Sequence, residues 1–180
     1  RRAPAIGLIA MTGIIAPMTP TPRPSKVLLA EPRGFCAGVD MAIKALTWMV
    51  NIFEPPVYCY HEIVHNRFVV ESFERAGVVF VDSIDAVPEG APAMLSAHGS
   101  GPEVVAGADQ RAGVVIDAVC PLVTKVHHEI RKVAAEDFDI IYIGHEGHDE
   151  AIGTLAVAPG AITLVEPETG LRDFSPADPA

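Results

Sequence analysis

Short β-rich runs alternate with stretches of helical apolar spacing from Lys26 onward. Runs of β-branched and aromatic residues predict the strands of one sheet at residues 27–30, 57–60, 78–81 and 93–95. Three further runs are expected to start a second sheet, at residues 114–116, 140–143 and 162–165. This alternation is typical of an α/β fold in which repeated parallel-sheet units carry flanking helices.

Two polar residues precede predicted helices and are candidates for their N-caps. Asp40 is placed to cap a helix that carries Ala42, Ile43, Leu46 and Met49 on one face. Asn66 is placed to cap the next helix, which runs through Phe73.

The sequence repeats itself loosely at a long interval. Cys36 follows the first predicted strand and Cys120 follows the fifth, 84 positions later, while His65 and His148 are 83 positions apart. Two copies of one strand-loop-helix unit explain this spacing better than chance does. We expect a tail or linker at 1–25, a first α/β unit at 26–119, and a second, truncated unit at 120–180.

Composition narrows the classes of protein to consider. The chain has 180 residues, 49% of them apolar, and a net charge of −10, which excludes nucleic-acid binding through a broad basic surface. The apolar stretch near the N-terminus is short and interrupted by proline and glycine, so we expect no membrane span. Three cysteines are too few for a disulfide framework and indicate a reducing compartment, the cytoplasm.

Two cysteines lie where ligands bind in parallel α/β folds, in loops between a strand and a helix. Cys36 stands between Gly34 and Gly38, and Cys120 directly precedes a helix. A helix N-terminus favours the thiolate that iron requires, so a shared metal centre is the interpretation we favour. Cys59 falls inside a strand and is assigned to packing.

Three histidines occupy matching loops, namely His65, His98 and His148. Together they predict a polar pocket for a phosphate group, because imidazolium groups supply positive charge that the acidic chain lacks elsewhere. Glu150 is either a helix-start carboxylate or a proton donor facing the pocket. The other histidines, His61, His127, His128 and His145, are interpreted as structural.

Residues 61–65 also match the H-E-x-x-H pattern of zinc proteases, which suggests a hydrolase as an alternative. That pattern requires a helix that places both histidines one turn apart. Here it follows a β-rich run and precedes the N-cap candidate Asn66, so we interpret it as a strand-to-helix turn.

Five segments resemble the LytB family of 4-hydroxy-3-methylbut-2-enyl diphosphate reductases, and they stand in that family's order at 31–40, 61–67, 96–99, 117–127 and 144–150. The resemblance implies similar α/β units around a pseudo-threefold axis, each donating one cysteine to a central [4Fe-4S] cluster. It implies that Cys36 and Cys120 are cluster ligands, that His65, His98 and His148 hold the diphosphate, and that Glu150 relays protons.

The implied reaction is the reductive dehydroxylation of an allylic diphosphate to isopentenyl and dimethylallyl diphosphate, the last step of the methylerythritol phosphate pathway. A ferredoxin or flavodoxin type carrier would deliver the electrons. The family's third unit has no counterpart before Ala180, so we expect a fragment with poor cluster retention and little activity. The alternative from another class is a non-catalytic module that binds diphosphate without a redox centre.

Overall fold

The computed structural model describes residues 25–168 and residue 170 of the chain. The expected tail at 1–25 therefore lies outside the described residues apart from Ser25. The chain divides into two compact units, residues 1–33 and 34–180, and every described helix and strand belongs to the second. None of the described helices combines the length and the apolar character that crossing a bilayer requires.

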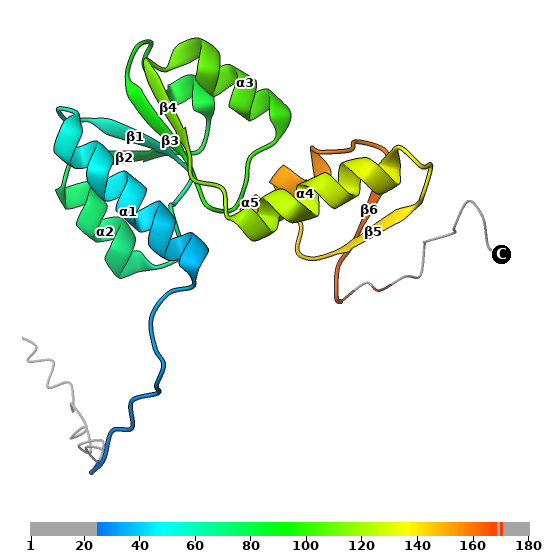
Figure 1. Ribbon diagram of the computed structural model, residues 1–180, viewed down its shortest axis with the longest axis horizontal. Coiled ribbons are helices and arrows are strands. Elements are labelled where there is room, and N and C mark those ends of the chain that lie inside the picture. Colours follow the sequence, from blue (N-terminus) through cyan, green and yellow to red (C-terminus); the bar gives the residue numbers. More distant parts are fainter. Residues whose placement is uncertain (1–24, 169, 171–180) are drawn as a thin grey trace, which may run out of the picture. The chain divides into compact units, whose positions relative to one another are not determined.

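Helices and strands alternate along the second unit (Figure 1). Their order is α1 (Ala37–Ile52), β1 (Val57–Tyr60), α2 (Arg67–Arg75), β2 (Val78–Val81), the 3-10 helix η1 (Ile84–Ala86), β3 (Pro92–Leu95), α3 (Pro102–Arg111), β4 (Val114–Asp117), α4 (Pro121–Ala134), β5 (Ile140–Ile143), α5 (Asp149–Leu155) and β6 (Ile162–Val165).

The strands of the described residues form two sheets, and every pairing in them is parallel. The larger sheet has the order β2-β1-β3-β4, and β5 pairs with β6 in the smaller one. The predicted α/β class is confirmed. The expectation that residues 114–116 start the second sheet is wrong, since β4 pairs with β3 and Leu95 stands opposite Asp117. The short crossover through α3 returns the chain directly alongside β3.

The strand expected at residues 27–30 is absent from the structure, and that prediction is wrong. Val27, Leu28 and Leu29 are exposed by 73%, 78% and 71%. A strand is stabilised by hydrogen bonds to a neighbouring strand, and these residues have no such neighbour within the described ranges. An apolar run without a ladder partner does not become a strand.

Helix α1 begins one turn earlier than predicted, so Asp40 is not its N-cap. Cys36 occupies that position, and Asp40 lies in the first turn, where its carboxylate accepts from Lys44 Nζ at 2.5 Å. An acidic side chain in the first turn is favoured by the helix dipole, which makes it easy to mistake for a cap. The predicted cap at Asn66 is confirmed, because its side chain accepts from two backbone amides of α2.

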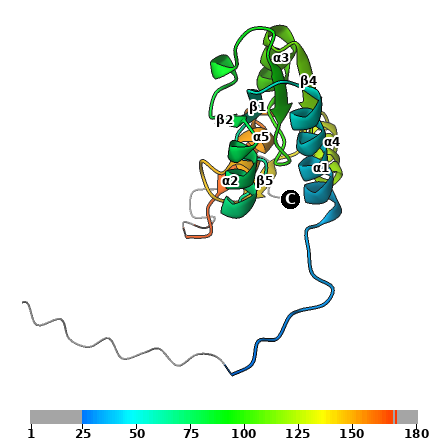
Figure 2. The same ribbon diagram turned by 90° about the vertical axis from the view of Figure 1, so that its left-hand side faces the viewer.

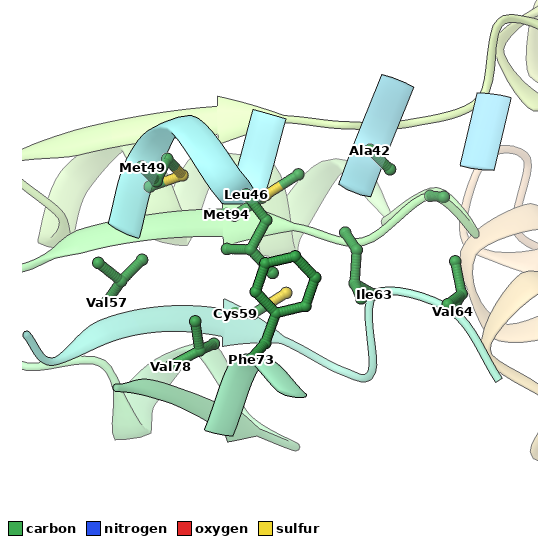
Figure 3. Packing of buried hydrophobic residues seen from close by; sticks show 11 residues of the cluster. Ala42, Leu46, Met49, Val57, Cys59, Ile63, Val64, Phe73, Val78 and Met94 are labelled. Carbon is green, nitrogen blue, oxygen red and sulfur yellow. The ribbon is translucent and has the colours of Figure 1, made fainter. Parts of the chain in front are cut away.

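The main core lies between the larger sheet and the helices α1 and α2 (Figure 3). Leu46 and Met49 of α1 and Phe73 of α2 pack in one cluster with Val57 and Cys59 of β1. Figures 1 and 2 show α3 on the opposite side of the sheet. Cys59 is fully buried there, and burial raises its pKa to about 12, which agrees with its assignment to packing.

Candidate functional site

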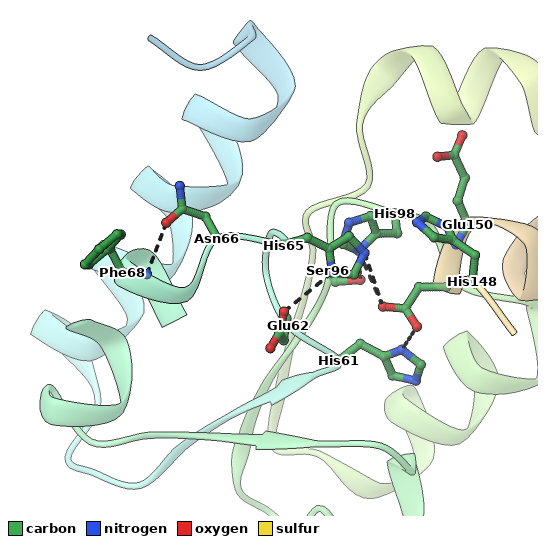
Figure 4. Close-up of polar contacts among 10 residues, drawn as sticks. His61, Glu62, His65, Asn66, Phe68, Ser96, His98, His148 and Glu150 are labelled. Carbon is green, nitrogen blue, oxygen red and sulfur yellow. Dashed lines mark hydrogen bonds and ion pairs between the residues drawn. The ribbon is translucent and has the colours of Figure 1, made fainter. Parts of the chain in front are cut away.

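The three histidines singled out from the sequence lie together (Figure 4). His65 follows β1, His98 follows β3, and His148 precedes α5. The ring centroids of His65 and His98 are 4.3 Å apart and stacked, and His148 lies 5.3 Å from the first and 6.2 Å from the second. We call these three side chains the histidine cluster.

Helix caps and a tight turn fix the backbone position of each residue of the histidine cluster. Asn66 caps α2 directly after His65. Gly99 follows His98 with φ +85°, a left-handed conformation that glycine adopts without strain, and so turns the chain sharply. His148 is the N-cap of α5, and its Nδ1 accepts from the backbone N–H of Glu150 at 3.3 Å. Acceptance at Nδ1 leaves the proton of the neutral His148 ring on Nε2.

Asp149 lies next to His61, His65 and His98, although no role was predicted for it from the sequence. One carboxylate oxygen, Oδ1, pairs with His61 Nδ1. The other, Oδ2, lies 3.8 Å from His98 Nδ1 and 4.0 Å from His65 Nε2. His61, interpreted earlier as structural, is therefore part of the same polar network. The only sequence signal for Asp149 was its position between His148 and Glu150.

The electrostatics around His98 favour its neutral form in the ligand-free protein. Burial lowers the pKa of His98, and the neighbouring His65 imidazole lowers it further. The carboxylate of Asp149 acts in the opposite direction, His148 lowers the pKa again, and Glu150 raises it. An anion bound at this ring would favour the imidazolium form and draw in a proton.

Glu150 is an exposed residue in the first turn of α5. In Figure 4 its carboxylate is directed away from His65 and His98. Its charge also acts on Tyr142, whose pKa is raised by burial and raised further by the Glu150 carboxylate. Its assignment as a proton relay stays a prediction.

Cys36 and Cys120 both stand at helix N-caps, the first on α1 and the second on α4. Cys36 is exposed and Cys120 is half-buried. A β-carbon added to Gly38 would lie 2.6 Å from Cys120 Sγ, so this sulfur rests against the first turn of α1. Cys36 caps that same helix, which brings both cysteines to one end of α1.

The H-E-x-x-H segment is a turn, as predicted. Residues 61–66 form bends between β1 and α2, and His61 has φ 59°. The helical pair of zinc ligands that defines a zinc protease is therefore not formed by His61 and His65. A cavity of about 570 Å³ opens beside this turn, lined in part by His61, Glu62, His65 and Asp149.

The fold and site together define a parallel α/β protein with three clustered histidines and two cysteines at one helix end. Residues 27–178 match the family described as LytB protein. The chain belongs to that family.

Relatives and solved structures agree with this assignment. The chain is 58% identical to 4-hydroxy-3-methylbut-2-enyl diphosphate reductase of Rhodopirellula baltica, over 85% of this chain and 49% of the relative. It is 56% identical to the reductase of that name from Mycobacterium leprae, over 78% of this chain and 42% of the relative. The E-1-hydroxy-2-methyl-but-2-enyl-4-diphosphate reductase structure from Plasmodium falciparum superposes with a TM-score of 0.75 at 39% identity, covering 81% of this chain and 46% of that one. The chain thus spans about half the length of these proteins.

Proposed function

We propose that this chain supplies a large part of the active site of a 4-hydroxy-3-methylbut-2-enyl diphosphate reductase. The relatives described above carry that activity in their names. The observation that carries the proposal is the meeting of three imidazoles from separate loops in a chain of net charge −10. A diphosphate is an anion that such a local site can hold although the chain as a whole repels it.

The histidine cluster binds the diphosphate in this proposal. His148 Nδ1 is occupied by the Glu150 amide, so its Nε2 is free to donate to a phosphate oxygen. Burial lowers the pKa of His98 and so favours its neutral form in the free site. Diphosphate binding would restore its charge and form a charge-assisted hydrogen bond, which is stronger than a neutral one. Ligand binding and proton uptake at His98 are therefore coupled.

Glu150 is assigned to proton delivery. It is exposed and follows His148 by two residues on the first turn of α5. An exposed carboxylate changes rotamer freely, so it can carry protons between solvent and a substrate whose diphosphate is held by His148. Those protons would allow the substrate's hydroxyl group to leave as water.

Cys36 and Cys120 fit the thiolate ligands of an iron–sulfur cluster, because Cys120 Sγ lies against the helix that Cys36 caps. When bound, a [4Fe-4S] cluster would supply electrons singly, received from a ferredoxin or flavodoxin type carrier, and Lewis acidity for cleavage of the C–O bond. Cys59 is excluded as a ligand by its burial and by a pKa of about 12. With two suitable thiolates, we expect this 180-residue chain to retain a cluster weakly and to show little activity alone.

Titration calorimetry of the chain with 4-hydroxy-3-methylbut-2-enyl diphosphate, and with pyrophosphate, tests the binding role. His65→Asn and His98→Asn should each weaken binding by roughly 10-fold or more, since a hydrogen bond to a charged group contributes about 1.5–3 kcal/mol. His128→Gln is the matched control, because it removes an exposed imidazole on α4. Equal affinities in the three variants and the parent chain would contradict the proposal.

A further inference from the structure

We propose that His65, His98 and Asp149 form a binding site for a divalent transition-metal ion, with Zn²⁺ as the preferred occupant. One ligand atom from each of the three residues lies within 4.8 Å of the others. Two imidazoles and a carboxylate are a donor set that suits zinc, which accepts nitrogen and oxygen ligands together. This site is separate from the cysteines, and it goes beyond the diphosphate role proposed above.

The separations between donors are close to those of a zinc site. Asp149 Oδ2 lies 3.8 Å from His98 Nδ1 and 4.0 Å from His65 Nε2. With bonds of about 2.0–2.1 Å, neighbouring donors of a tetrahedral zinc ion are roughly 3.4 Å apart. The two carboxylate–imidazole separations therefore need to shorten by only about half an ångström around the ion, which rotamer adjustment can supply, and all three donors already lie within 4.8 Å of one another.

Outer partners orient two of the three ligands. His61 Nδ1 holds Asp149 Oδ1, which leaves Oδ2 facing the two imidazoles. Glu62 Oε2 lies 3.4 Å from His65 Nδ1, so a proton on Nδ1 leaves the Nε2 lone pair directed toward Asp149. Metal-bound histidines ordinarily donate their second ring N–H to a carboxylate or carbonyl in this way.

Ser96 is the one neighbour that must adjust. Its Oγ lies 3.4 Å from His98 Nδ1, the nitrogen that would bind the ion. The contact is long, and a hydroxyl hydrogen rotates readily, so the Nδ1 lone pair can be released.

The H-E-x-x-H segment gains a different role from the one its pattern suggests. In a zinc protease both histidines of the segment bind the metal from one helix. Here His65 is a ligand, whereas Glu62 and His61 orient the ligands. The adjoining cavity of about 570 Å³, lined in part by His61, His65 and Asp149, leaves room for water at an open position of the ion.

Zinc affinity of the full chain, measured by competition with a chromophoric chelator, tests the proposal. Cys36→Ser and Cys120→Ser are introduced first, so that thiolates do not bind the added Zn²⁺. This double variant keeps only the buried thiol of Cys59 and should bind one equivalent. Asp149→Asn should weaken binding by about 100-fold, and His61→Gln by about 10-fold through the orientation of Asp149. With Co²⁺ in place of Zn²⁺, the visible absorption of the bound ion should fall most in Asp149→Asn and less in His61→Gln.

Two control variants carry matched changes away from the site. His128→Gln removes an exposed imidazole and Asp109→Asn removes an exposed carboxylate, and neither should alter the zinc affinity. Zinc affinity of Asp149→Asn equal to that of its folded parent overturns the proposal. So does a folded Cys36→Ser/Cys120→Ser chain that binds no Zn²⁺, whether or not it binds pyrophosphate. Pyrophosphate titration of the same samples reports separately on the proposed function.

Discussion

At the scale of single residues, His127 of α4 contacts Thr154 of α5, close to Gly99 in the loop that carries His98. Its ring is buried, and His127 Nε2 lies 3.4 Å from Thr154 Oγ1. Burial lowers the pKa of His127, and Arg131 lowers it further, against the opposing effects of Glu150 and Asp117. The folded protein therefore holds this ring neutral at a pH where the unfolded chain protonates it.

The sign of the resulting pH dependence follows from that shift. Well above pH 6.5 the ring is neutral in both states, and His127 gives no pH dependence. As the pH falls below this value the unfolded chain takes up a proton that the folded chain does not, so stability falls until the folded pKa is reached. The slope from one such group is at most about 1.4 kcal/mol per pH unit.

Urea denaturation at pH 7.5 and pH 5.5 measures this effect. The unfolding free energy of the parent chain should be lower at pH 5.5, and His127→Gln should reduce the size of that fall. It should not abolish the fall, because burial lowers the pKa of His98 as well. His128→Gln, which removes an exposed imidazole from the same helix, is the matched control. Equal pH dependence in the two variants would show that His127 is not responsible.

Residue types and loop positions were enough to predict which histidines gather. His65, His98 and His148 each follow a strand or precede a helix at corresponding places, and ligand sites of parallel folds form there. His61 and Asp149 were missed because their pairing joins residues 88 positions apart. No local pattern specifies such a contact; it depends on how α5 packs against the loops after β1 and β3.

At the scale of secondary-structure elements, Gly153 sets how closely α5 approaches the loop after β3. A β-carbon added at Gly153 would lie 2.4 Å from the carbonyl oxygen of Gly99, which directly follows His98. Backbone atoms on both sides leave little freedom to relax. The absence of a side chain at Gly153 thus allows α5 to bring His148 and Asp149 to His98.

Alanine substitution at two helical glycines distinguishes the effect of this close approach on stability from the effect of helix propensity. Gly153→Ala should destabilise the chain by about 1–3 kcal/mol through overpacking and should weaken pyrophosphate binding. Gly107→Ala in α3 is the matched control, since its β-carbon would meet the movable Ile84 methyl at 3.2 Å. At Gly107 the gain in helix propensity of up to about 1 kcal/mol should equal or exceed the cost of the contact with Ile84. Urea midpoints and calorimetry provide both readouts, and stabilisation by Gly153→Ala would contradict the close approach.

Elements were predictable where local sequence decides them. The strands β1, β2, β5 and β6 stand where their apolar runs do, and the cap at Asn66 accepts from the backbone amides two and three residues further on. The sheet membership of β4 and the fate of residues 27–30 were not predictable in this way. Both depend on which strand lies close enough to form backbone hydrogen bonds, and only the folded chain decides that.

At the scale of the whole molecule, the repeated cysteines are the feature that links the fold to the proposed chemistry. Cys36 and Cys120 stand at the N-caps of α1 and α4, and Cys120 Sγ lies against Gly38 of α1. The histidine cluster comes from other loops of the same unit, after β1, after β3 and before α5. A chain spanning about half of its relatives' length therefore carries both a candidate diphosphate site and two candidate cluster ligands.

Thiol bridging under native, reducing and anaerobic conditions tests this account most directly. A short bifunctional reagent such as dibromobimane, followed by peptide mass spectrometry, should link Cys36 to Cys120 within one chain. Cys59 is the internal control and should remain unmodified, because burial raises its pKa to about 12 and excludes the reagent. A Cys36–Cys120 bridge as the main product is the result we predict. Separate modification of the two thiols with no bridge between them would contradict a shared centre.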